Sequence, residues 1–199
     1  MSLALAAPAS LPRSPPSPTA PATETSTIPQ PPQPQRSLIV PPLNFAMVAP
    51  GVYRSGYPNR KNFPFLQTLR LRCIMYLCED DYSADNIEFL ERENVRVLHV
   101  RISGNKEPFG EMDHRDIAAA LVQVLDTRNH PILIHCNKGA YRIGCLVGCL
   151  RKLQNWSLTS IFDEYRRFAG PKIRIADQEF IEVYSEPVQY AKDHAPSWL

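Results

Sequence analysis

Residues 131–144 constrain the fold of this chain more than any other segment. The apolar run Ile132–Ile134 is typical of a buried strand, and a helical pattern begins at Gly144. Between them lies a short loop that starts at Cys136 and contains Gly139, which has no side chain to forbid a positive φ. A buried strand that passes through a tight loop into a helix is a unit of α/β proteins.

Strand and helix patterns continue to alternate on both sides of this unit. We predict strands at Phe45–Val48, Val52–Ser55, Cys73–Leu77, Val95–Val100 and Ile132–His135, and helices at Phe63–Leu71, Ala84–Glu93, Asp113–Leu125, Ile143–Leu153, from the cap Ser157 to Phe168, and Ala176–Tyr190. This order predicts a single α/β domain with a central, mostly parallel sheet flanked by helices. Ligands of such sheets bind beyond the carboxyl ends of the strands, where Cys136 lies.

The first 42 residues differ from the rest, because they hold 12 of the 20 prolines and no glycine. Such a segment buries too little apolar surface to offset the entropy of ordering it. We therefore predict a disordered Pro-rich tail at residues 1–42 and one folded domain at residues 43–199. The Pro-rich runs are candidate ligands for Pro-recognising domains with aromatic grooves, and the alternative is an inert solvated tail.

Composition excludes several classes of function. A formal net charge of +2 argues against broad nucleic-acid binding. The chain has no run of about 20 apolar residues, so we expect no membrane contact. Five cysteines without a signal peptide indicate a reducing compartment, and we expect a cytoplasmic protein. The cysteines and histidines lack the spacing of a zinc site, so we expect no metal and no cofactor.

The loop after the predicted strand suits the capture of a phosphate ester. Backbone amides of a tight loop and the positive end of the following helix bind phosphate oxygens, and they lower the pKa of an enclosed thiol below about 8.5. Arg142 supplies a planar, permanently charged fork for two oxygens. The predicted site comprises the nucleophile Cys136, Arg142, the supporting His135, and the substrate-binding residues Lys106, Asn137, Lys138, Gly139, Ala140 and Tyr141. The alternative for Cys136 is an inert buried thiol.

The segment His135-Cys136-x-x-Gly139-x-x-Arg142-x-Gly144 resembles the signature of cysteine-dependent phosphatases. Other stretches are similar to the plant and fungal atypical dual-specificity phosphatases: Asn44–Val48, Gly51–Pro58, Asn62–Leu66, Gly104–Phe109, Leu150–Trp156 and Ser160–Phe168. The resemblance implies the cysteine-phosphatase fold and a phosphocysteine intermediate. It also implies cleavage of the β-phosphate of inositol pyrophosphates, and many such relatives act on phosphotyrosine as well. Lys172 and Arg174 also match the family pattern.

The general acid is the weak part of the resemblance. The family places an aspartate on a mobile loop before the nucleophile, whereas this chain has none in Gly104–Phe109. Glu107 is the candidate acid, and Asp113 is the fallback or a helix N-cap. Asp80 and Asp81 are better explained as a turn and cap before Ala84. A phenolate leaving group, with a pKa of about 10, needs an acid far more than a phosphate with a pKa of about 6 does. The missing aspartate therefore favours a diphosphate substrate over a phosphotyrosine protein.

Three positions depart from the family pattern and leave alternatives open. Ala140 and Tyr141 replace a common Lys-His pair, which predicts weaker binding of polyanions. Ile143 replaces a hydroxyl residue that would bond the leaving thiolate, so we expect slower breakdown of the phosphocysteine. These departures keep open a catalytically weak phosphate-binding module. A reversible disulfide between Cys78 and Cys136 is a further hypothesis, and its alternative is a buried cysteine at a strand end.

Overall fold

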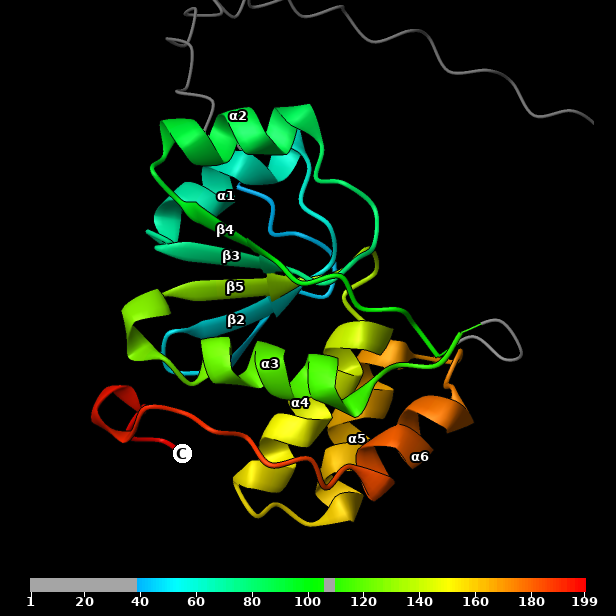
Figure 1. Cartoon of the computed structure of the whole chain (residues 1–199). Helices are drawn as coiled ribbons and strands as arrows, with labels where there is room; N and C mark the ends of the chain where they lie inside the picture. Colours follow the sequence, from blue (N-terminus) through cyan, green and yellow to red (C-terminus); the bar gives the residue numbers. More distant parts are fainter. Residues whose placement is uncertain (1–38, 106–109) are drawn as a thin grey trace, which may run out of the picture. The chain divides into compact units, whose positions relative to one another are not determined.

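A computed structural model describes residues 39–105 and 110–199, and in it a sheet lies between two groups of helices (Figure 1). Helices α1 and α2 lie on one side of the sheet, and α3 to α6 lie on the other. The strands are β1 (Ala46–Ala49), β2 (Val52–Ser55), β3 (Cys73–Tyr76), β4 (Arg96–His99) and β5 (Ile132–His135). The helices are α1 (Phe63–Thr68), α2 (Ala84–Arg92), α3 (His114–Val124), α4 (Tyr141–Leu153), α5 (Leu158–Ala169) and α6 (Ile175–Val183), with short 3-10 turns at Arg60–Asn62, Thr127–Asn129 and Lys192–His194.

The sheet has five strands in the order β1-β2-β5-β3-β4. Only the pairing of β1 with β2 is antiparallel, and β2, β5, β3 and β4 run parallel to one another. The predicted fold class, a mostly parallel sheet flanked by helices, is confirmed. Parallel strands end at the same edge of a sheet, so the loops that follow these four strands meet at one edge. The loop that begins at Cys136 is placed there, between the loops after β2 and β3.

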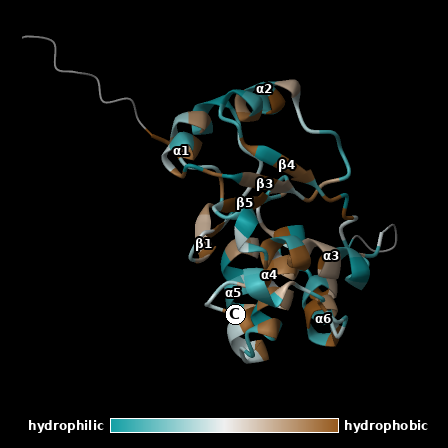
Figure 2. Ribbon diagram, turned by 60° about the vertical axis from the view of Figure 1, so that its left-hand side comes forward, coloured by the Kyte–Doolittle hydropathy of each residue, from teal (hydrophilic) through white to brown (hydrophobic). Residues whose placement is uncertain are grey.

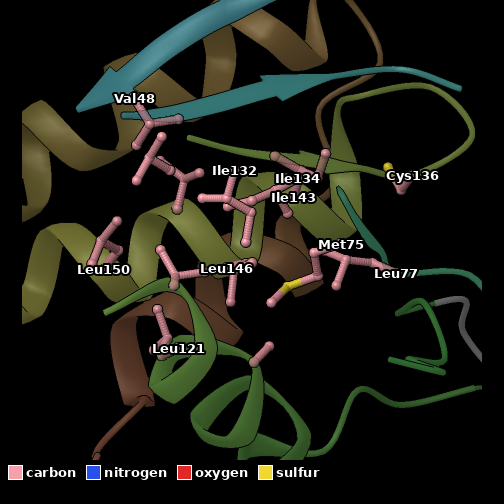
Figure 3. Close-up of a cluster of buried hydrophobic side chains, with 14 of the residues drawn as sticks. Val48, Met75, Leu77, Leu121, Ile132, Ile134, Cys136, Ile143, Leu146 and Leu150 are labelled. Carbon is pink, nitrogen blue, oxygen red and sulfur yellow. The ribbon is translucent and has the colours of Figure 1, made fainter. Parts of the chain in front are cut away.

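The core is centred on β5 and α4. Every residue of β5 is buried, as expected of a central parallel strand with helices on both faces. Figure 2 shows the corresponding hydrophobic colouring along β5. Figure 3 shows Ile143, Leu146 and Leu150 of α4 in one cluster with Ile132 and Ile134 of β5. Helix α4 also packs against α3, α5 and α6, so the helix that follows the loop is held on several sides.

Side-chain caps fix the start of three helices. Ser157 caps α5 as predicted, since its hydroxyl accepts a hydrogen bond from the Ser160 amide. Asp113 caps α3 by accepting from the Arg115 amide at 2.8 Å. The cap of α2 is Ser83, rather than Asp80 or Asp81. A carboxylate used as a cap is committed to backbone amides, which favours the capping role for Asp113.

The predicted extent of α6 is wrong at its carboxyl end. The helix ends at Val183, whereas the hydrophobic pattern predicted that it would reach Tyr190. Pro187 accounts for the difference, because its ring collides with the carbonyl of Val183 in a continued helix and disfavours helical geometry at Glu186. The following segment runs back over the domain, and the Trp198 indole donates to the Pro50 carbonyl at 3.1 Å.

Residues 1–38 of the predicted tail lie outside the described residues. Val40, which the structure does describe, accepts a hydrogen bond from the Asn62 side chain at 3.2 Å. Within residues 39–105 and 110–199, no helix is both long enough and apolar enough to cross a bilayer.

Candidate active site

A pocket of about 170 Å³ opens where the loop between β5 and α4 meets the loop after β4. Its lining residues are Gly104, Cys136, Asn137, Lys138, Tyr141, Arg142 and Arg174. Cys136 is only 3% exposed and follows the last residue of β5 directly. Figure 3 shows it at the end of the apolar cluster. The structure therefore brings the predicted nucleophile and the predicted arginine into one cavity.

Three successive carbonyls of this loop are bound by donors from the amino-terminal part of the domain. The Asn137 carbonyl accepts from the Tyr57 amide at 3.1 Å. The Lys138 carbonyl accepts from the Asn44 side chain at 2.9 Å. The Gly139 carbonyl accepts from the Arg54 guanidinium, also at 2.9 Å. These donors belong to β2 and to the segments on either side of β1 and β2.

This pattern fixes the direction of the loop amides. In a planar trans peptide the N–H points opposite to the carbonyl of the same peptide unit. The amides of Lys138, Gly139 and Ala140 therefore point away from the donors that hold the three carbonyls. Convergent amides of this kind form an anion-binding concavity, and α4 adds the positive end of its dipole. The predicted role of the loop in binding phosphate is consistent with this geometry.

Gly139 lies where the loop contacts the end of β2. Its φ is +68°, in the left-handed region that favours glycine. A Cβ at this position would lie 2.4 Å from the Gly56 nitrogen and 2.6 Å from the Ser55 carbonyl carbon. Both neighbours are backbone atoms, so neither can move aside without moving the strand end. Gly139 and Ala140 are buried and shape the loop from behind, rather than lining the pocket.

Arg142 is the second residue of α4, and its guanidinium lies toward the loop after β3. Its Nη1 donates to the Cys78 sulfur at 3.4 Å, and its Nη2 lies 4.0 Å from a carboxylate oxygen of Glu79. Its Nε is buried and has no partner among the described residues. An unpaired buried donor costs about 1–3 kcal/mol. A bound anion in the pocket would satisfy it.

Cys78 lies beside the loop, as its position at the end of β3 predicted. Its thiol donates to the Asn137 side-chain oxygen at 3.3 Å. Burial raises the pKa of this thiol, although the nearby Arg142 opposes the effect. All five cysteines are free in the structure. The disulfide between Cys78 and Cys136 stays a hypothesis.

Arg174 supplies a second cation at the mouth of the pocket. Its guanidinium carbon lies 3.7 Å from the centre of the Tyr141 ring, and its Nη1 donates to the Asn105 carbonyl at 3.3 Å. A cation held over an aromatic face gains about 0.5–2 kcal/mol. Tyr141 therefore holds the charged Arg174 guanidinium at the wall of the pocket, which both residues line.

His135 lies beneath the loop and does not line the pocket. It is fully buried, and its Nε2 is 2.9 Å from the Tyr82 hydroxyl. The rings of Tyr57, Tyr76 and Tyr82 surround it. Burial lowers the pKa of His135 to about 3. The imidazole is therefore neutral in the folded protein and packs beneath the loop, and its supporting role stays a prediction.

This depressed pKa predicts an acid-sensitive fold. Between about pH 6.5 and 3 the unfolded chain protonates this histidine and the folded chain does not, so stability falls as pH is lowered through that window. From pH 7 to pH 5 we expect a loss of about 2 kcal/mol from this group. Urea denaturation at both pH values, with His135→Asn as comparison, measures it. Equal pH dependence in the two proteins would contradict the prediction.

The remaining predicted acids and cations are located as follows. Lys106 and Glu107 lie outside the described residues, so Glu107 stays a prediction. Asp113 caps α3. Asp81 is exposed and pairs with Arg101 at 2.6 Å. Asn44, Arg54 and Tyr57, which hold the loop carbonyls, were not predicted as site residues. Their only signal was membership of the stretches that resemble the family.

A buried cysteine directly after a central strand, with an arginine from the first turn of the next helix in the same pocket and an amide-bearing loop between them, defines a cysteine-dependent phosphatase. Comparison with known proteins agrees with this class. The chain belongs to the tyrosine phosphatase family, whose model matches residues 39–199.

Within this family, the chain is similar to two proteins that are named as inositol diphosphatases. The chain is 54% identical over 147 residues to the rice protein "Inositol diphosphatase DSP1" (Oryza sativa subsp. japonica), covering 74% of this chain and 66% of the rice protein. It is 50% identical over 149 residues to the yeast "Inositol diphosphatase SIW14" (Saccharomyces cerevisiae), covering 74% of this chain and 53% of the yeast protein. The solved structure of the Siw14 catalytic core matches with a TM-score of 0.72 at 50% identity, over 74% of this chain and 88% of that one.

Proposed function

We propose that this phosphatase cleaves the β-phosphate of inositol pyrophosphates through a phosphocysteine intermediate. One observation carries the proposal. Arg142, Arg174 and Lys138 line the pocket around Cys136, and none of the described lining residues is a carboxylate. A pocket rich in cations and poor in acids suits a substrate with several phosphates and a good leaving group. The names of the rice and yeast relatives support the same substrate class.

Each residue has a role in this reaction. The Cys136 sulfur attacks the β-phosphorus, and the bond from phosphorus to the bridging oxygen breaks, leaving the α-phosphate on the ring. Arg142 and the loop amides hold the equatorial oxygens through this step. Water then attacks the phosphocysteine and releases inorganic phosphate. Ile143 is buried in the core and offers no hydroxyl to the thiolate, so slower breakdown of the intermediate stays a prediction.

The leaving group explains how the reaction proceeds with little acid catalysis. A phosphate leaves with a pKa of about 6, whereas a tyrosine phenolate has a pKa of about 10. In this proposal, Arg174 and Lys138, which line the same pocket, contact the phosphates that remain on the ring. Because Tyr141 fixes the Arg174 guanidinium, replacement of the family's Lys-His pair does not remove every cation from the mouth.

The proposal is tested by measuring phosphate release by the full chain. An inositol pyrophosphate and a phosphotyrosine peptide are assayed side by side. Cys136→Ser is the matched control, because it removes the nucleophile and keeps nearly the same volume. We expect release from the pyrophosphate to be preferred and to disappear in Cys136→Ser.

The other outcomes identify the alternatives. A preference for the peptide would mean that an acid such as Glu107 protonates a phenolate, which favours a protein tyrosine or dual-specificity phosphatase. Tight pyrophosphate binding without release of phosphate from either substrate would instead favour the phosphate-binding module.

A further inference from the structure

We propose that Arg54 is a positioning residue of the phosphate-binding loop. Its guanidinium fixes the Gly139 peptide and supplies a permanent positive charge close to Cys136. The inference concerns how the phosphatase site is built, so it holds for any phosphate substrate. Arg54 does not line the pocket, and it acts through the loop rather than on the substrate.

The position of Arg54 follows from the register of the sheet. Strand β2 lies parallel to β5, and Arg54 pairs with Ile134, two residues before Cys136. From there its Nη2 reaches the Gly139 carbonyl at 2.9 Å. Its guanidinium carbon lies 3.6 Å from the centre of the Phe168 ring on α5, which supports the group from another side.

Burying the Arg54 side chain does not stabilise the fold. The residue is 1% exposed, and its Nε and Nη1 have no partner among the described residues. A buried charge without a paired carboxylate is costly, and an apolar side chain of similar size would be more stable there. A destabilising group at this position indicates a functional reason for it.

The charge of Arg54 is largely uncompensated in the resting protein. The Glu164 carboxylate raises the pKa of Arg54, but Glu164 is bound by Arg151 at 2.7 and 3.0 Å. Burial lowers the pKa of Arg54 to about 10, so it remains charged near neutral pH. The anions able to balance it are those of the loop: the Cys136 thiolate and a bound phosphate.

Other charged or titratable groups also face the loop. They are Lys138 of the loop itself, Arg142 and Cys145 of α4, Cys78 and Glu79 after β3, His135 of β5 and Arg174 before α6. Substitutions of Arg54 leave all of them in place, so a changed response of Cys136 reports the loss of the Arg54 charge.

Arg54→Met and Arg54→Lys separate the two parts of the proposal. Methionine removes both the hydrogen bond and the charge, and we expect kcat for phosphate release to fall about tenfold to a hundredfold. Inorganic phosphate should bind more weakly. The pH midpoint for iodoacetamide alkylation of Cys136, followed by mass spectrometry of its peptide, should rise by about one pH unit. Lysine keeps the charge but lacks the planar fork, so kcat should fall while the midpoint stays near that of wild type.

Asn129→Ala is the control for a purely structural effect. Asn129 is buried at the opposite end of β5, and its side chain donates to the Gln123 carbonyl at 2.7 Å. We expect this variant to lower thermal stability and to leave kcat and the alkylation midpoint unchanged. If Arg54→Met behaves in the same way, the proposal is overturned. If Arg54→Met does not fold, a folded Arg54→Lys with wild-type kcat and phosphate affinity overturns it instead.

Discussion

Gly139→Ala is expected to reduce kcat/KM for phosphate release by at least about a hundredfold, because displacements of about 1 Å in a catalytic site have effects of that size. The added Cβ would meet the backbone of Ser55 and Gly56 at 2.4 to 2.6 Å. The loop must then move away from β2, and the bond from Arg54 to the Gly139 carbonyl is lost with it. Steady-state kinetics and the affinity for inorganic phosphate measure the change.

Gly170→Ala separates this effect from backbone strain alone. Gly170 follows α5 and has a φ of +63°, but a Cβ there would have no atom within 4 Å. We expect it to lose about 1–3 kcal/mol of stability and to keep its activity, because only backbone strain applies: its φ of +63° and ψ of −143° lie in a region that residues other than glycine rarely adopt. Wild-type activity in Gly139→Ala would show that the contact with β2 does not shape the site.

Arg142→Lys is expected to reduce kcat/KM by about a hundredfold to a thousandfold, the usual effect of removing one donor that stabilises transition-state charge. Lysine retains the charge, but a single ammonium cannot hold two equatorial oxygens as a guanidinium does. Kinetics on the inositol pyrophosphate and binding of inorganic phosphate test the prediction together. Both kcat/KM and the affinity for inorganic phosphate should fall, because Arg142 holds the same phosphate oxygens in each case.

Arg101→Lys is the matched control for this substitution. Arg101 follows β4 at the same edge of the sheet and pairs with Asp81 at an exposed position. Exposed ion pairs contribute about 0–1 kcal/mol, so activity and stability should change little. If Arg142→Lys keeps more than a tenth of the wild-type kcat/KM, the bidentate role of Arg142 is wrong.

The sequence predicts the fold well where one pattern dominates. The bounds of β2 and β5 are as expected, because β5 is a short apolar run that ends at the Cys136 loop and β2 starts directly after the Pro50-Gly51 turn. The end of α6 was missed, because hydrophobic spacing beyond Val183 continued past the point where Pro187 stops the helix. The sequence likewise placed Ser157 correctly as a cap, since capping depends on neighbouring residues alone.

Within the candidate site, the sequence likewise predicts the residues of one local motif and misses those that depend on tertiary contacts. Cys136 and Arg142 belong to one contiguous motif, so the sequence locates them directly. Asn44 and Arg54 hold the loop through contacts that depend on strand order, and hydrophobic patterns do not specify that β2 lies next to β5. The stacking of Arg174 on Tyr141 was missed because it depends on how the start of α6 packs against α4, although Arg174 itself matched the family pattern.

The bonds that hold the loop carbonyls have a consequence for how the protein acquires activity. Asn44 is 94 residues from Lys138, and Arg54 is 85 residues from Gly139. Contacts of such separation close large loops of chain, which is slow and entropically costly. A peptide holding only β5, the loop and α4 would contain the whole motif but none of these donors. Recovery of phosphate binding on refolding should therefore follow the docking of β2 and its flanking segments, rather than the formation of α4.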